Sequence, residues 1–320
     1  MSNLSDQTLE LLNKEYLNIS GLAIAKDGKI AYEYFAQDSE KDAKIHVASV
    51  TKSVFSILVG IALEKQYIKS IHEKIISYFP DLKISSRNKT LSQLEIKHLL
   101  TMTAPYKFRS EPYSKVFSTQ NWGWTALQLL GGKKPIGEFH YTTIGIQVLS
   151  SILEQTTQMN INAFATKYLF TPLRITPPET LPIDSRETYF KFIKNHYSNG
   201  WAADPQGTNT SGWGLMLSVH DLLKIGQLYL QNGQWEGKSI VSSQWVKEST
   251  TTHSYWENKP YGYLWWILDN ETFAAIGDGG NIIYVNRSKN LVIGIVSHFV
   301  PRYKDRIDFI ENHLIPVYSL

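Results

Sequence analysis

Ser49 and Lys52 are the pair of residues in this sequence whose types and spacing best suit covalent chemistry. A serine acts as a nucleophile only when a base lies within hydrogen-bond reach. If Ser49 begins a helix, Lys52 lies three residues on along the same face, so its amine can fold back to the hydroxyl. Backbone N–H groups at the helix start also favour negative charge on an attacked carbonyl oxygen. The pair therefore predicts nucleophilic attack on an acyl carbon.

The spacing alone carries little weight, because the sequence holds a second copy that begins at Ser86 and ends at Lys89, within a polar run. The residues after Ser49 separate the two copies. They are apolar at nearly every position, which is typical of a buried helix: Val54, Phe55, Ile57, Leu58, Val59, Ile61, Ala62 and Leu63. Burial disfavours a charged amine and makes Lys52 a usable base. The alternative is a helix-capping serine followed by a solvated lysine.

The elements around this pair indicate an α+β fold. Strand-like stretches lie at both ends of the chain, and the turn residues Asp27 and Gly28 join the first two. Helical periodicity fills the middle and returns near the end, at residues 303–314. The strand-like stretches span residues 19–25, 29–35, 273–276, 281–285 and 291–296, and the clearest middle helices span 144–153 and 220–230. We expect an antiparallel sheet built from both chain termini, flanked by helices, with an inserted mostly helical lobe.

This arrangement predicts two domains. Residues 1–46 together with residues 254–320 form a discontinuous sheet domain, and residues 47–253 form the mostly helical domain, with the active site at their interface. The chain has 320 residues, of which 42% are hydrophobic, so it can bury a large core.

Composition excludes several classes of function. The 32 basic and 29 acidic residues form no basic block that would follow a phosphate backbone, so we expect no nucleic-acid partner. The absence of cysteine excludes disulfides, thiolate catalysis and cysteine-ligated zinc. Histidines at metal-ligand spacing and glycine-rich phosphate loops are missing too, so we expect no metal and no cofactor.

No apolar run approaches the roughly 18 residues that a membrane span needs, and the polar start of the chain lacks the pattern of a signal peptide. We therefore expect no transmembrane segment and, for the sequence as written, a cytoplasmic protein. Removal of a signal peptide would leave the same sequence and place the protein outside the cell or in the periplasm.

Several segments together resemble the β-lactamase-related serine hydrolases, which include class C β-lactamases, penicillin-binding proteins and family VIII esterases. The similarity runs from about residue 19 to residue 296. The segments occur in the family's order, and they are Ser49-Val50-Thr51-Lys52-Ser53, residues 96–103, Phe170-Thr171-Pro172-Leu173, residues 221–228 and residues 261–266. The resemblance implies that Ser49 is the nucleophile and that Lys52 is its proton partner.

The family's second motif is Tyr-x-Asn or Tyr-x-Ser, and here it corresponds to Tyr141-Thr142-Thr143. The resemblance implies that Tyr141 shares the base role with Lys52, and an adjacent ammonium is expected to favour its phenolate. Thr143 lacks the amide that contacts substrate in lactamases, which argues against efficient β-lactam hydrolysis. Tyr197 begins a rival Tyr-x-Asn, but it lies directly before a loop that follows the second motif in the family.

The third motif, usually Lys-Thr-Gly or His-x-Gly, corresponds to Asp278-Gly279-Gly280. Its glycines allow a substrate backbone to lie close to the strand. We expect the N–H groups of Asn281 and Ser49 to form the oxyanion hole. Asp278 stands where a basic residue is usual. It would repel the carboxylate that a penicillin or a D-Ala-D-Ala peptide presents, and it would tolerate a neutral or cationic group.

We therefore predict a serine hydrolase that acts through a covalent acyl-enzyme on an ester or amide bond. Its partner is a small-molecule ester, amide or peptide substrate. The alternative is a penicillin-binding protein, or one that recognises peptidoglycan peptides, with little or no turnover. A stable acyl adduct would distinguish that alternative.

Overall fold

The computed structural model describes residues 4–37, 39–83, 89–194 and 198–318. The second Ser-x-x-Lys copy, at Ser86, and the rival Tyr197 lie outside the described residues. No helix within the described ranges is long and apolar enough to cross a membrane.

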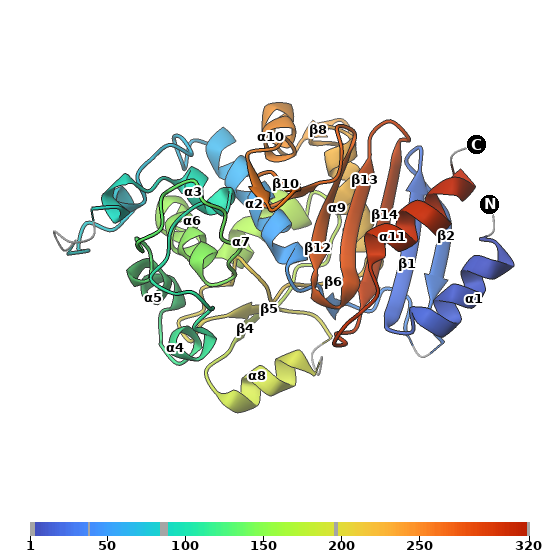
Figure 1. Ribbon diagram of the computed structural model, residues 1–320, viewed down its shortest axis with the longest axis horizontal. Coiled ribbons are helices and arrows are strands. Elements are labelled where there is room, and N and C mark those ends of the chain that lie inside the picture. The colour runs from blue at the N-terminus through green and yellow to red at the C-terminus, as the bar shows by residue number, and fades with distance from the viewer. Residues whose placement is uncertain (1–3, 38, 84–88, 195–197, 319–320) are drawn as a thin grey trace.

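The centre of the fold is an antiparallel sheet of eight strands in the described part of the chain (Figure 1). The order across the sheet is β2-β1-β14-β13-β12-β11-β10-β9, so strands from the two ends of the chain pair at β1 and β14. This confirms the predicted α+β class. The bounds are β1 Ile19–Lys26, β2 Lys29–Phe35, β9 Ser254–Trp256, β10 Lys259–Tyr261, β11 Trp266–Ile267, β12 Thr272–Gly277, β13 Asn281–Asn286 and β14 Leu291–Ser297.

Successive side chains of a strand point to opposite faces of the sheet. Both faces of the central strands are buried, so neighbouring residues belong to two different cores. Ile24 and Ile293 are paired in register and face the smaller core, which the helices of the two chain ends cover. Ala23 and Val292 belong to the larger core on the opposite face. The covering elements on the first face are α1 Asp6–Glu15, α11 Arg306–Phe309 and the helical turns Ile310–Leu314 and Ile315–Tyr318.

Helices α2 (Val50–Glu64) and α9 (Val219–Leu230) lie on the opposite face of the sheet (Figure 1). Every residue of α2 from Val50 to Ala62 is buried, which confirms the prediction of a buried helix behind Ser49. Gly226 lets α9 approach closely, because a Cβ at this position would lie 2.4 Å from Val292 Cγ1.

The remaining helices form a group beside the sheet, on the side that carries α2 in Figure 1. In this view α10 lies at the top of the group and α8 at the bottom. Their bounds are α3 Ile96–Leu100, α4 Tyr113–Phe117, α5 Trp122–Gln128, α6 Val148–Thr157, α7 Ile161–Ala165, α8 Arg186–Ile193 and α10 Ser243–Ser249. Short strand pairs link this part, and they are β3 Ile45–His46 with β6 Met216–Leu217, β4 Thr180–Pro182 with β5 Trp201–Ala203, and β7 Gln234–Trp235 with β8 Lys238–Ser239. Single helical turns complete it at Ile75–Tyr78, Leu91–Gln93, Gly145–Gln147 and Thr166–Phe170. The domain boundaries at residues 46 and 254 stay a prediction.

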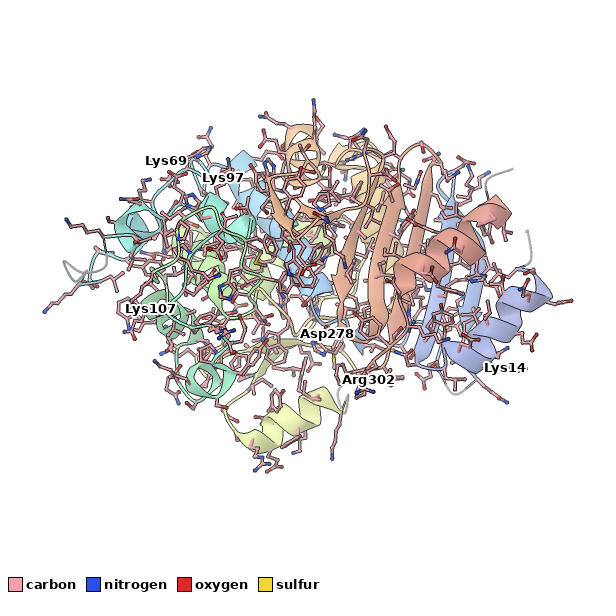
Figure 2. The ribbon with its side chains drawn as sticks, viewed as in Figure 1. Lys14, Lys69, Lys97, Lys107, Asp278 and Arg302 are labelled. Carbon is pink, nitrogen blue, oxygen red and sulfur yellow. The ribbon has the colours of Figure 1, made fainter. Side chains whose placement is uncertain are left out.

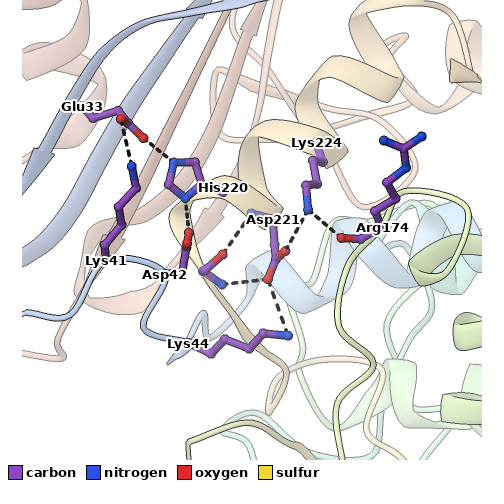
Figure 3. A network of polar contacts seen from close by, with 9 residues as sticks. Glu33, Lys41, Asp42, Lys44, Arg174, His220, Asp221 and Lys224 are labelled. Atoms are coloured by element: carbon purple, nitrogen blue, oxygen red, sulfur yellow. Dashed lines mark hydrogen bonds and ion pairs between the residues drawn. The ribbon is translucent and has the colours of Figure 1, made fainter. Parts of the chain in front are cut away.

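A network of charged groups fixes the connection from β2 towards Ser49 against the start of α9 (Figure 3). His220 on α9 contacts both Glu33 of β2 and Asp42 of the loop. Lys44 Nζ lies 3.6 Å from a carboxylate oxygen of Asp221, which also caps its own helix by accepting from the N–H of Ser218. The chain that leads into the Ser49 turn is therefore held at several points.

Candidate active site

Ser49 lies at the entrance to α2, directly after a backbone turn that few side chains adopt. Ala48 has φ 47°, in the left-handed region, where an alanine is strained. The Thr51 hydroxyl donates to the Ala48 carbonyl at 2.7 Å and holds this turn. Although Ser49 occupies the N-cap position, its side chain makes no capping hydrogen bond. The hydroxyl is therefore available to other groups.

Lys52 is the group that meets it. Its Nζ donates to Ser49 Oγ at 2.8 Å, to the Gly212 carbonyl at 2.8 Å and to Thr143 Oγ1 at 3.1 Å. Lys52 is 1% exposed, so the alternative of a capping serine beside a solvated lysine does not describe this pair. Burial lowers the pKa of Lys52 to about 7, against the opposing effect of the Glu111 and Asp278 carboxylates.

Tyr141 lies on the other side of the same amine. The Lys52 Nζ is 4.8 Å from the centroid of the Tyr141 ring, and the ring stacks on Trp266 at 5.9 Å. Burial raises the pKa of Tyr141, even though the nearby Ser49 hydroxyl acts to lower it. The expectation that the neighbouring ammonium favours phenolate was wrong, because burial disfavours the phenolate charge more strongly.

The third motif forms the turn between β12 and β13. Gly279 and Gly280 have φ 81° and 88°, a conformation that favours glycine. Asn281 is buried and serves the turn, since its Nδ2 donates to the Asp278 carbonyl at 2.8 Å and its Oδ1 accepts from Ser297 N. The Asp278 side chain is exposed, and it lies between the sheet and the helical part (Figure 2).

Gly277 brings this turn to the backbone at Ser49, and the sequence reasoning missed its role. A Cβ at Gly277 would lie 2.3 Å from the Val47 carbonyl oxygen and 3.0 Å from the Ser49 nitrogen. The end of β12 therefore touches the backbone of the Ser49 turn. The motif residues Asp278, Gly279 and Gly280 gave no sign that the glycine before them makes the contact.

Glu111 is a second residue that sequence reasoning missed. Its carboxylate accepts hydrogen bonds from Thr143 N at 3.1 Å and from Ile144 N at 3.0 Å, and it contacts the Thr142 hydroxyl. It therefore fixes the backbone of the second motif. Tyr113 lies near the same groups, since Glu111 and Thr143 both act on the pKa of its hydroxyl, which burial raises. Neither residue belongs to a recognisable pattern, because the loop that carries them meets the motif only in the folded chain.

Two residues from opposite ends of the chain hold the 278–280 turn from behind. Asn18 Nδ2 donates to the Gly279 carbonyl at 2.7 Å and to the His298 carbonyl at 2.8 Å. Arg306 donates to Asn18 Oδ1 at 2.6 Å, and its side chain packs so closely on Gly280 that a Cβ there would lie 2.6 Å from Nε. The turn is therefore fixed by both chain termini.

Two cavities meet at Ser49. Both are lined by Ser49, Tyr113, Thr143 and Asp278. The first, of about 860 Å³, is bordered mainly by apolar and aromatic groups, and we call it the aromatic cavity. Its apolar and aromatic residues include Phe117, Ile183, Tyr189, Ile193, Trp213 and Phe299.

The second cavity, of about 830 Å³, contains Tyr141, and we call it the tyrosine cavity. Its ionisable residues, Tyr141 and the shared Tyr113 aside, are Glu111, Lys259, Asp278, Tyr303, Asp305 and Arg306. Ser49 thus lies where a substrate can extend in two directions.

The structure brings together all the predicted site residues. Ser49, Lys52, Tyr141 and Thr143 are joined by hydrogen bonds or ring contacts, and Asp278 borders both cavities. Gly279, Gly280 and Asn281 form the adjoining turn. Thr143 belongs to this group through its hydroxyl, which contacts the Lys52 amine. No group of three or more potential metal ligands lies among the described residues.

Comparison with solved structures defines the class to which this fold belongs. A penicillin-binding protein from Bacillus halodurans aligns with a TM-score of 0.71 at 15% identity, over 95% of this chain and 99% of that one. EstCE1, a hydrolase with promiscuous acyltransferase activity, aligns with a TM-score of 0.72 at 14% identity, over 97% and 96% of the two chains. The fold is that of the β-lactamases and penicillin-binding proteins.

The Beta-lactamase family model matches residues 14–314, and the chain belongs to this family of serine hydrolases. The 6-aminohexanoate-dimer hydrolase of Paenarthrobacter ureafaciens is 22% identical over 298 residues, which cover 84% of this chain and 70% of that protein. An uncharacterized protein of Alkalihalophilus pseudofirmus is 25% identical over 242 residues, or 74% of this chain. The chain spans 64% of the length of that second relative.

Proposed function

We propose that this protein is a serine hydrolase that cleaves an ester or amide bond of a small acyl substrate through a covalent acyl-enzyme. Ser49 is the nucleophile, and Lys52 and Tyr141 move its proton. The observation that carries the proposal is the 2.8 Å contact between Lys52 Nζ and Ser49 Oγ, made by an amine that is 1% exposed. A buried amine with a pKa near 7 is a base at neutral pH.

In the first step Ser49 Oγ attacks the acyl carbon while Lys52 Nζ takes the hydroxyl proton. The carbonyl oxygen becomes an oxyanion, for which the N–H groups of Ser49 and Asn281 are the proposed donors. The close approach at Gly277 supports this role, since it places the 278–281 turn against the Ser49 turn. Gly279 and Gly280 give the turn its shape.

In the second step the bond from the acyl carbon to the leaving group breaks. Because the raised pKa keeps Tyr141 protonated, its hydroxyl donates a proton to the leaving group and recovers one from Lys52. Water then attacks the acyl carbon while Lys52 takes its proton, the bond from Ser49 Oγ to the acyl carbon breaks, and Oγ recovers the proton from Lys52. Tyr141 therefore acts as a proton relay beside the base Lys52.

Thr143 and Asp278 support esters and amides over lactams as substrates. The Thr143 hydroxyl accepts from Lys52 Nζ, so it holds the base and offers no amide to a substrate. The exposed carboxylate of Asp278 borders the cavity at Ser49, where it repels a substrate carboxylate. The relatives named a 6-aminohexanoate-dimer hydrolase and a hydrolase with acyltransferase activity support acyl transfer as the reaction class.

The test combines intact-mass measurement with turnover of p-nitrophenyl esters. The parent protein and Ser49→Ala are each treated with a fluorophosphonate and, separately, with a penicillin. We expect one fluorophosphonate adduct and ester turnover in the parent only. Equal labelling and turnover by Ser49→Ala would overturn the proposal. A stable penicillin adduct without ester turnover would favour the penicillin-binding alternative.

A further inference from the structure

The two cavities at Ser49 differ in whether Tyr141 lines them. Tyr141 borders the tyrosine cavity and is absent from the lining of the aromatic cavity. A group that donates a proton to the leaving group must lie on the leaving-group side of the scissile bond. The leaving group therefore extends into the tyrosine cavity, and the acyl group extends into the aromatic cavity. This assignment rests on the proposed function.

Within the described residues, no hydrogen bond or ion pair engages the Asp278 carboxylate. The other two carboxylates of the tyrosine cavity are already engaged. Glu111 accepts backbone N–H groups of the second motif, and Asp305 accepts the N–H groups of Ile307 and Asp308 at the start of α11. Asp278 is therefore the carboxylate that is left to meet a ligand beside Ser49.

The cations of the same cavity are held by protein groups. Arg306 is 3% exposed and donates to the Lys304 carbonyl at 2.9 Å and to Asn18 Oδ1 at 2.6 Å. Lys259 lies 5.4 Å above the ring of Trp256. Neither faces Asp278 in an ion pair, so neither neutralises it by contact.

The walls of the tyrosine cavity are aromatic. They include Tyr113, Tyr141, Trp256, Trp266 and Tyr303. Protein cations already lie over Tyr141, Trp256 and Tyr303. In the part of the chain that the structure describes, the rings of Tyr113 and Trp266 carry none. Electron-rich ring faces beside a free carboxylate attract ammonium groups.

We infer that the leaving group of the natural substrate carries a positively charged amine or quaternary ammonium, which binds in the tyrosine cavity against Asp278, while an apolar acyl group binds in the aromatic cavity. The reaction is otherwise that proposed above. The bond from Ser49 Oγ to the acyl carbon forms, the bond to the amino alcohol or diamine breaks, and the Ser49 proton leaves with it. Water then releases the acid.

The test compares two esters of the same phenylacetyl group. One has choline as its alcohol, and the other has 3,3-dimethylbutanol, which replaces the charged nitrogen of choline by carbon. The choline charge does not titrate, so the ratio of the two kcat/KM values reports the charge alone. Any effect of an Asp278 variant on the pKa of Lys52 cancels in this ratio. Parent, Asp278→Asn and Asp278→Lys are compared, with Asp184→Asn of the aromatic cavity as a control.

We expect the parent to favour the choline ester about fivefold, the gain from one partly exposed charge pair. Asp278→Asn should bring the ratio close to one, Asp278→Lys should reverse it, and Asp184→Asn should keep the parent ratio. A parent ratio at or below one, or an unchanged ratio in Asp278→Asn, overturns the inference. Ser49-dependent turnover of the neutral ester would then leave the proposed function standing, whereas its absence would overturn both.

Discussion

At the scale of single residues, burial is what gives Lys52 its chemistry. A solvated lysine beside Ser49 would hold its proton at neutral pH and offer the hydroxyl no base. The surroundings of Lys52 supply three hydrogen-bond acceptors but no carboxylate in contact, and its pKa falls to about 7. Both the rate and the stability of the protein should therefore depend on this one group.

The first prediction concerns the pH profile. With a pKa near 7, the fraction of neutral Lys52 amine rises with pH through that value, so kcat/KM for a neutral ester should rise and then level off. Lys52→Arg stays protonated and should lose about 10² to 10⁴ in kcat/KM, the usual contribution of a general base. Stopped-flow measurement of ester hydrolysis between about pH 5 and 9 checks this. A Lys52→Arg protein with the parent profile would contradict the role of Lys52.

The second prediction concerns stability. Burial lowers the pKa of Lys52 from 10.5 to about 7. Between these values the unfolded chain holds a proton that the folded protein lacks, so stability rises with pH. Relative to Lys52→Met, the unfolding free energy of the parent should rise by about 1.4 kcal/mol per pH unit in this window. Below the window the difference between the two proteins should not change with pH. Urea unfolding of both proteins at several pH values measures the difference. A pH-independent difference would show that the amine titrates normally.

The residue types of the site could be predicted, whereas their supports could not. Ser49, Lys52 and the turn at Gly279 belong to patterns of neighbouring residues, and such patterns can be recognised in one sequence. Glu111 and Gly277 act through contacts with distant segments, and their own neighbours give no sign of this. The error about the Tyr141 phenolate has the same origin, because its burial comes from distant aromatic residues such as Trp266.

At the scale of elements, the site depends on how closely β12 approaches the start of α2. The sequence predicted an antiparallel sheet built from both chain ends and the buried α2, whereas the order of the strands is seen only in the structure. The closeness of that approach follows from Gly277, which has backbone atoms of the Ser49 turn where another residue would place its Cβ. The strand and the helix are thus matched through one residue without a side chain.

Gly277→Ala tests this contact. The new Cβ would lie 2.3 Å from the Val47 carbonyl oxygen, so the turn or the strand must move. We expect a loss of about 1 to 3 kcal/mol in unfolding free energy and at least a tenfold loss in kcat/KM. Gly21→Ala is the control, because its Cβ would meet only side-chain atoms, a Val296 methyl group at 3.2 Å and Val219 at 3.5 Å. Full activity in Gly277→Ala would show that the close approach is dispensable.

At the scale of the whole molecule, both ends of the chain support the 278–280 turn beside Ser49. Asn18 precedes β1 and Arg306 begins α11, and the two meet behind Gly279. Tyr16, directly after α1, packs against Phe309 of α11, with ring centroids 4.3 Å apart. A substitution at Asn18, directly before β1, should therefore alter the active site.

Asn18→Ala removes an acceptor for Arg306 and a donor for two carbonyls. We expect about 2 kcal/mol of lost stability and a fall in kcat of about tenfold with little change in KM, since the turn is loosened but the cavities remain. Asn13→Ala removes an exposed contact with Tyr34 from the same segment and should change neither. Equal kinetics for both variants would exclude a link from Asn18 to catalysis.

The pairing of β1 with β14 also determines the order in which the protein can assemble during synthesis. The ribosome makes α2, which ends at Glu64, long before strand β12, which begins at Thr272 and helps to cover this apolar helix. Pairings between distant segments form slowly, and exposed apolar surface in the meantime promotes aggregation. The turn at Ser49 can therefore meet the end of β12 only after that late strand has been made and has joined the sheet.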